Sequence, residues 1–237
     1  ELPEDVAEQS IADEAALRPL AVQAPVMPEP SPSQVQRAVR AISGAKRPLI
    51  LVGNGVIRRN ASEVVRSLAR AFQIPVLQTF MAKGVMPDSD PLSLHTLGLL
   101  ARDYAAVVME QADVVLAIGY DFVEYAPCFW NPRKNKHIVH VDGLPAEVDE
   151  HYIVEVGELG DLRLSLPLIQ KQLSSSSASF EPSWARQARK TVTDGFDAEL
   201  AGPPSWPMRP QHIMHELRAV LRHDDVVVCD VGAHKLW

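Results

Sequence analysis

Short apolar runs alternate along this chain with segments whose apolar residues recur at helical spacing. The run RPLILVG at 47–53 ends in a glycine, and similar runs are expected to form strands at 74–80, 112–119, 137–142 and 152–156. Short continuous apolar runs are typical of strands buried on both faces of a parallel sheet. By contrast, 83–98 is so rich in Pro, Gly and Asp that it predicts a loop.

Between these runs the apolar period changes to that of a helix with one buried face. It predicts helices at about 32–43, 61–72, 102–111 and 161–173. Their inward faces include Val35, Val39 and Ile42 in the first helix, and Val64, Leu68 and Phe72 in the second. Strands that alternate with helices in this way predict an α/β fold, a Rossmann-like doubly wound parallel sheet, over residues 34–173.

The segments on either side of this domain differ from it in composition. Residues 1–33 are expected to be a tail and linker, because 24–33 holds four prolines in ten residues. Residues 174–207 form a serine-rich linker that contains an amphipathic helix at 180–200, with Trp184, Ala188 and Val192 on one face. Residues 208–237, with a helix at 211–221 and a strand at 224–230, look like the start of a second α/β unit. We therefore expect a fragment of a longer protein.

Composition excludes several classes of function. The net charge of −7, without a basic cluster, counts against nucleic acid or an anionic membrane as partner. No run approaches the roughly 20 apolar residues that span a bilayer. The first residues have neither a basic region nor an apolar core, so we do not expect them to form a signal peptide. Two cysteines are too few for a disulfide framework or a tetrahedral zinc site, which fits a reducing cytoplasm.

The turn VGNGV at 52–56 is the first candidate for chemistry. Gly53, Asn54 and Gly55 follow a predicted strand and open a helix, where backbone N–H groups can approach a phosphate. The third glycine of the dinucleotide motif is missing, because position 58 is Arg. A tight turn that needs positive φ explains the same glycines equally well.

Acidic residues follow two further predicted strands. Asp121 and Glu124 lie in GYDFVEY at 119–125, where they could accept hydrogen bonds from a ribose, cap the following turn, or pair with Arg133. Asp142 ends the strand at 137–142, where it could hold a ribose hydroxyl or serve as the N-cap of a following helix.

The residue types show no self-sufficient catalytic machinery. His212 and His215 lie three apart on a predicted helix, but no carboxylate or cysteine nearby completes a metal site. The sequence also contains no nucleophile elbow or Ser-His-Asp arrangement.

The order of several segments resembles the thiamine-diphosphate-dependent enzymes of the acetolactate synthase family. ELPEDV at 1–6 resembles the end of their N-terminal pyrimidine-binding domain, and RPLILVGNGV followed by IPVLQTFMAKGVMPDSDPLSLHTLGL resembles their six-stranded, Rossmann-like central domain. CDVGAHKLW at 229–237 resembles the first strand and loop of the C-terminal pyrophosphate-binding domain. Within the family, 112–132 is most similar to the catabolic α-acetolactate synthases.

The resemblance implies cofactors. The parent protein would use thiamine diphosphate and Mg²⁺, and Gly232 and His234 match a Gly-x-His loop that contacts the diphosphate in relatives. The catalytic glutamate and the magnesium ligands would lie outside this chain. Biosynthetic members carry an arginine after the third predicted strand that helps to bind FAD, whereas 120–128 here holds none. This departure puts FAD in question, and our hypothesis is a dinucleotide cleft without an obligatory flavin.

The resemblance also implies an activity and partners. The parent would join two molecules of pyruvate, or of another 2-oxo acid, to give 2-acetolactate and CO2, in branched-chain amino acid or acetoin metabolism. It would be a cytoplasmic homodimer or homotetramer, and the isolated fragment would be inactive. The alternatives are another thiamine-diphosphate enzyme, namely a 2-oxo acid decarboxylase or pyruvate oxidase, and a non-catalytic nucleotide-binding module.

Overall fold

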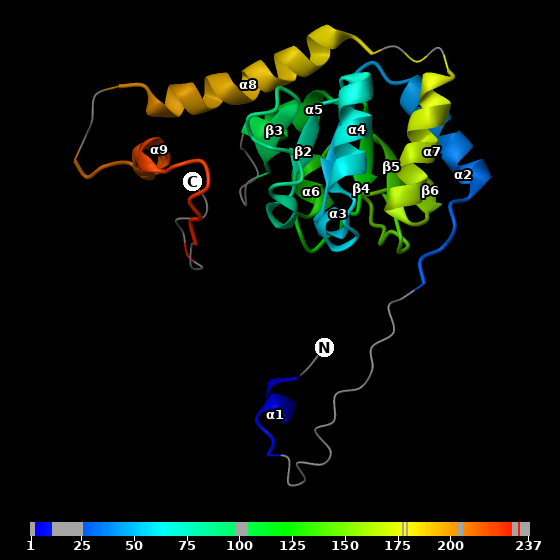
Figure 1. The fold of residues 1–237 in the computed structure, drawn as a ribbon, viewed down its shortest axis with the longest axis horizontal. Coiled ribbons are helices and arrows are strands. Elements are labelled where there is room, and N and C mark those ends of the chain that lie inside the picture. Colours follow the sequence, from blue (N-terminus) through cyan, green and yellow to red (C-terminus); the bar gives the residue numbers. More distant parts are fainter. Residues whose placement is uncertain are drawn as a thin grey trace.

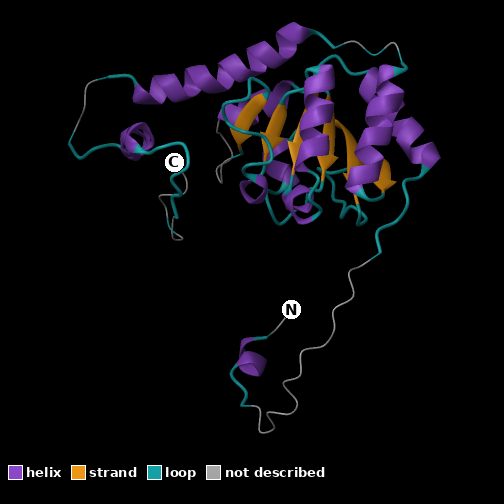
Figure 2. Ribbon diagram, in the orientation of Figure 1, coloured by secondary structure: helices purple, strands orange, loops and turns teal. Residues whose placement is uncertain are grey.

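The centre of the computed structural model is a six-stranded sheet in which every pair of neighbouring strands is parallel (Figure 1, Figure 2). The structure describes residues 3–10, 26–97, 104–176, 178, 180–202, 206–228 and 232. The strand order is β3-β2-β1-β4-β5-β6. The strands are β1 Pro48–Val52, β2 Val76–Gln78, β3 Ser93–Thr96, β4 Val114–Ile118, β5 His137–Asp142 and β6 Val154–Leu159. The predicted doubly wound Rossmann-like fold is confirmed.

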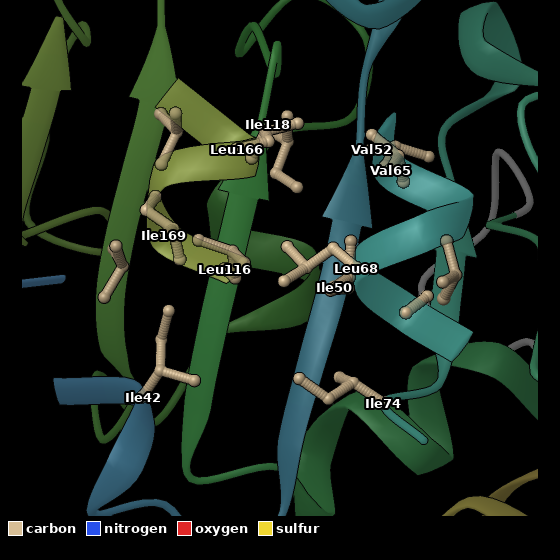
Figure 3. Close-up of a cluster of buried hydrophobic side chains, with 14 of the residues drawn as sticks. Ile42, Ile50, Val52, Val65, Leu68, Ile74, Leu116, Ile118, Leu166 and Ile169 are labelled. Carbon is tan, nitrogen blue, oxygen red and sulfur yellow. The ribbon is translucent and has the colours of Figure 1, made fainter. Parts of the chain in front are cut away.

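Helices cover both faces of this sheet. One face carries α2 (Pro32–Ser43), α4 (Ser62–Phe72) and α7 (Leu162–Ser174), and the other carries α5 (Tyr104–Gln111), α6 (Pro127–Trp130) and α8 (Pro182–Leu200). Because side chains alternate along a strand, Ile50 and Val52 of β1 join the first core cluster, whereas Leu49 and Leu51 join the second. Figure 3 shows the first cluster, with Leu68 of α4 and Leu166 of α7 beside the central strands.

The predicted helices are present, but in one of them, α4, the buried face differs from the predicted one. In α2 the residues expected to face inward are buried, and so are Trp184, Ala188 and Val192 of α8. In α4, however, Val65, Leu68 and Ala69 are fully buried, while Val64 and Phe72 are only partly so. The inward face of α4 is therefore rotated from the predicted one, and the residues that it buries, Val65, Leu68 and Ala69, recur at positions i, i+3 and i+4.

The loop predicted at 83–98 contains a strand. β3 pairs with β2 at the edge of the sheet, and a register shift interrupts the pairing between Val76 and Gln78. Leu92, Leu94 and Leu97 bury their side chains beside it. The turn-forming residues of this segment precede the strand, and an edge strand needs a hydrogen-bonded neighbour on one side only. Composition averaged over the segment hides so short a strand.

The strand predicted at 224–230 is not formed in the part that the structure describes. Residues 224–228 follow α9 (Pro210–Val220) as a turn and irregular chain, and Val226 and Val228 are 85% and 90% exposed. A parallel strand is stable only when neighbours satisfy its backbone groups. No described residue pairs with this segment. Residues 229 and 230 lie outside the described residues.

Two further α-helices and one 3-10 helix, η2 (Phe80–Ala82) after β2, complete the described elements. α1 (Glu4–Ala7) lies near the N-terminus, and the five-residue α3 (Asn54–Arg58) follows β1 directly. Among the described helices, none combines the length and the apolar character needed to cross a bilayer.

Candidate functional site

The candidate site lies where the strand order of the sheet reverses, between β1 and β4. In open α/β sheets, ligands bind outside the carboxyl ends of the strands at this switch point. β1 runs there into Gly53, Asn54 and Gly55, and β4 runs into the turn that begins at Gly119. The fold thus brings the predicted glycine turn next to the loop that carries Asp121, while Asp142 ends β5, the next strand along.

Both glycine amides of the turn after β1 are bonded to the end of β4. The backbone N–H of Gly53 donates to the carbonyl of Ile118 at 3.0 Å, and that of Gly55 donates to the carbonyl of Gly119 at 2.9 Å. A phosphate bound at such a turn would need these N–H groups. In this chain the neighbouring strand already uses them.

Glu124 binds the third amide of the same turn. The backbone N–H of Asn54 donates to both of its carboxylate oxygens at 2.9 Å. The Thr79 hydroxyl, at the end of β2, donates to its Oε2 at 2.5 Å. Burial raises the pKa of Glu124 above its ordinary value, while the hydrogen bonds from Thr79 and Asn54 act in the opposite direction. One carboxylate thus joins the ends of β1, β2 and the loop after β4.

Close approach, rather than positive φ, explains the glycines of the turn. Gly53 is extended, with φ −115° and ψ −177°. A Cβ there would lie 2.6 Å from both the Tyr120 Cα and the Glu124 Oε1, and one on Gly55 would lie 2.6 Å from the Gly119 Cα. The facing Gly119 does have positive φ, at 58°. The expectation of positive φ was therefore wrong for Gly53 and Gly55.

Asp121 acts as a local cap. Its Oδ1 accepts the backbone N–H of Val123 at 3.1 Å, and its carbonyl accepts that of Glu124 at 3.1 Å. This is the turn-capping alternative for Asp121. The pairing with Arg133 is not formed, because that guanidinium lies 3.9 Å from Glu110 instead.

Asp142 is half-buried and bonded to the residue that follows it. Its Oδ1 accepts the backbone N–H of Gly143 at 2.5 Å. The structure has no helix between 143 and 153, so the N-cap alternative for Asp142 was wrong. A ribose contact by Asp121 or Asp142 stays a prediction.

A small cavity opens beside these two carboxylates. Its volume is about 130 Å³, and its lining includes Asp121, Asp142, His140 and Tyr152. His140 is 3% exposed, and its Nδ1 lies 2.8 Å from the Tyr152 hydroxyl. Burial lowers the pKa of His140, whereas the charge of Asp142 acts to raise it. Ligand pockets usually enclose about 300–1,000 Å³, so this cavity is too small for a dinucleotide.

The residues of the switch point do not fit the FAD of the biosynthetic acetolactate synthases. The three turn amides are bonded within the protein, Glu124 lies against the turn, and the adjoining cavity is small. The sequence suggests a ribose contact, a turn cap or a pair with Arg133 for Glu124, and gives no indication of a role for Thr79. The one signal in the sequence was the acidic residue itself, since its partners lie 45 and 70 residues away.

The residues expected to contact thiamine diphosphate are only partly described. Gly232 lies in a half-exposed bend, and His234 lies outside the described residues. Since 224–228 forms no sheet, the described residues do not assemble a diphosphate site. Within the described ranges, His, Cys, Asp and Glu also form no group of three or more suited to a metal ion.

Comparison with known proteins places this fold in a family. The family of the thiamine pyrophosphate (thiamine diphosphate) enzyme central domain matches residues 35–169. An acetolactate synthase of Bacillus subtilis (strain 168) is 30% identical over 224 residues, which cover 92% of this chain and 38% of that protein.

Two further relatives are an acetolactate synthase subunit and a pyruvate oxidase. A probable acetolactate synthase large subunit of Methanocaldococcus jannaschii is 28% identical, over all of this chain and 42% of its own length. A pyruvate oxidase of Lactiplantibacillus plantarum is 29% identical, over 89% of this chain and 34% of its own length. The chain thus spans about two fifths of such relatives, and with its parallel sheet and matched segment it belongs to the thiamine pyrophosphate enzyme central-domain family.

Proposed function

We propose that this chain is the central part of a thiamine-diphosphate-dependent carboligase that resembles acetolactate synthase. The reaction is the joining of two pyruvate molecules to give 2-acetolactate and CO2. The observation that carries the proposal is the extent of the similarity to the Bacillus subtilis protein, which covers 92% of the chain, whereas the family match covers 35–169 only. The segments that flank the sheet therefore share in the similarity.

The role proposed for the chain itself is structural. The turn amides at 53–55 are bonded within the chain, which supports a role in holding the neighbouring domains rather than in binding a cofactor. In the parent, residues 34–173 would be the central domain between 1–33, the tail of a pyrimidine-binding domain, and 208–237, the start of a pyrophosphate-binding domain, with 174–207 as linker. The cofactors of the parent would be thiamine diphosphate and Mg²⁺, in a cytoplasmic homodimer or homotetramer.

A second candidate is supported by a specific relative. The similarity to a pyruvate oxidase is 29%, close to that to the acetolactate synthases, so an oxidase is the main alternative reaction. A nucleotide-binding module without catalytic activity is less well supported, because the described switch point has no unbonded turn amide at 53–55.

Product analysis separates these candidates. The full-length parent would be incubated with pyruvate, thiamine diphosphate and Mg²⁺, and the products measured. We expect 2-acetolactate, with no flavin absorbance in the purified protein. Acetate formation with oxygen consumption would instead indicate an oxidase, and acetaldehyde a decarboxylase. The 237-residue chain alone should form none of these products, and acetolactate formed by it would refute the structural role.

A further inference from the structure

The switch point already contains an anion. A dinucleotide bound in a doubly wound sheet places its diphosphate against the backbone N–H groups of the turn after the first strand. In this chain the side chain of Glu124 reaches that turn from the loop after β4. Its two oxygens accept the N–H of Asn54, and it is the acceptor that a phosphate oxygen would have to replace.

We propose that Glu124 takes the place of a dinucleotide diphosphate at the turn after β1 and is the residue that keeps FAD and other dinucleotides out of this domain. This role belongs to the central domain itself and is the same whichever 2-oxo acid reaction the parent performs.

Packing supports the proposal. Glu124 Oε1 would lie 2.6 Å from a Cβ on Gly53, so the carboxylate rests directly on the Cα face of the turn. Phosphate oxygens need that face to reach the amide of Asn54. The remaining two amides, of Gly53 and Gly55, point to carbonyls of β4 and its turn at 3.0 and 2.9 Å. A diphosphate would therefore have to displace the carboxylate before it met any donor of the turn.

Charge supports it as well. The donors that hold Glu124 are a backbone N–H and a hydroxyl, both neutral, and no ion pair to Glu124 forms among the described residues. Asp121, in the same loop, adds a second negative charge near the carboxylate of Glu124. An incoming diphosphate would meet both of these acidic groups.

The test follows the turn amides by NMR in the ¹⁵N-labelled chain, with ADP and FAD as probes. In the wild-type chain, the amide resonances of Gly53, Asn54 and Gly55 should not move at millimolar ADP or FAD. In Glu124→Ala, the Asn54 amide should respond to ADP, with affinity at least about tenfold higher than in wild type, equivalent to ~1.4 kcal/mol. Wild-type shifts at 53–55 would overturn the proposal.

Glu147→Ala is the matched control. Glu147 is an exposed carboxylate that lines the neighbouring cavity and makes no hydrogen bond to the turn in the described structure. Its removal subtracts the same charge from the same edge of the sheet. If Glu147→Ala gains ADP affinity as Glu124→Ala does, the effect is one of net charge and the proposal is wrong.

A measurement on the wild type guards against a variant that does not fold. If Glu124 bonds the turn, the Asn54 amide resonance should follow the titration of a carboxyl group whose pKa lies above the ordinary 4.5. An Asn54 amide that is insensitive to pH across this range would show that the carboxylate is not its partner, and would overturn the proposal without any substitution.

Discussion

The indole Nε1–H of Trp184 donates to the carbonyl oxygen of Pro48 at 2.8 Å. This bond ties the first turn of α8 to the first residue of β1, although the two residues are 136 positions apart. α8 therefore packs on the second face of the sheet and helps to complete its core, together with α5 and α6.

Removal of this anchor should destabilise the whole domain. Trp184 is 4% exposed, so Trp184→Ala should lower the free energy of unfolding by about 3–5 kcal/mol. Trp184→Phe keeps most of the apolar contact but leaves the Pro48 carbonyl unpaired, and should cost about 1–3 kcal/mol. Urea denaturation measures both. Trp206→Phe is the control, because Trp206 is 92% exposed; a change there as large as in Trp184→Phe would contradict the prediction.

The contact between the two switch-point turns predicts a strong effect of a single methyl group. In Gly53→Ala the new Cβ would lie 2.6 Å from the Tyr120 Cα, which belongs to the backbone and has little freedom to move. We expect a loss of about 1–3 kcal/mol or more in unfolding free energy. Gly157→Ala in β6 is the control, since its Cβ would meet only Val154 Cγ1, at 3.9 Å. That variant should be neutral or slightly stabilised.

His140 should make stability depend on pH. Burial lowers its pKa below the ordinary 6.5, so the folded protein keeps the imidazole neutral while the unfolded chain takes up a proton as the pH falls below about 6.5. The free energy of unfolding should therefore decrease as the pH decreases from about 6.5 to the pKa of folded His140. The slope should be at most ~1.4 kcal/mol per pH unit.

Substitution should remove this contribution. In His140→Phe, the slope of unfolding free energy against pH between about pH 5 and 7 should be smaller than in wild type. His215→Phe, at an exposed position of α9, should keep the wild-type slope. Equal slopes in wild type and His140→Phe would show that His140 is not the group responsible.

Asp161 should stabilise α7 as its N-cap. Its side chain accepts the backbone N–H of Arg163 at 2.9 Å, and the Arg163 guanidinium lowers the pKa of this carboxyl. Asp161→Ala should cost about 0.5–2 kcal/mol of unfolding free energy, whereas Asp161→Asn, which keeps an acceptor, should cost less. Because the folded pKa is depressed, the advantage of Asp over Asn is present above the ordinary 3.8 and is lost as the pH falls through the folded pKa. Equal losses in the two variants would exclude the capping role.

The strands that the sequence predicted well are those buried on both faces. β1 and β4 are continuous apolar runs, and every residue in them is buried. β3 was missed because an edge strand of four residues, with polar neighbours, lacks such a run. For the segment 224–228, by contrast, a strand was predicted that the structure does not form. Its apolar run predicts a strand, but strand formation also requires a partner, and the described residues supply none.

The candidate site, too, could be predicted from the sequence only in part. The sequence located the glycine turn and the acidic loop, because glycines after a strand and carboxylates at a strand end are local signals. It could not show that Gly53 faces Tyr120, or that Glu124 bonds Asn54. Those contacts depend on the register of β1 against β4, which pairs Val52 with Ile118.

The sequence by itself determined the alternation of strands and helices, and with it the doubly wound class of the fold, because periodicity and turn chemistry act over a few residues. Only the tertiary structure decided that the switch point is closed. Whether the turn amides are bonded within the protein depends on which groups the parallel pairing of β1 and β4 brings within hydrogen-bond distance. Here the pairing brings the Glu124 carboxylate to the amide of Asn54. Residues 70 positions apart in the chain meet there because the sheet places the ends of their strands side by side.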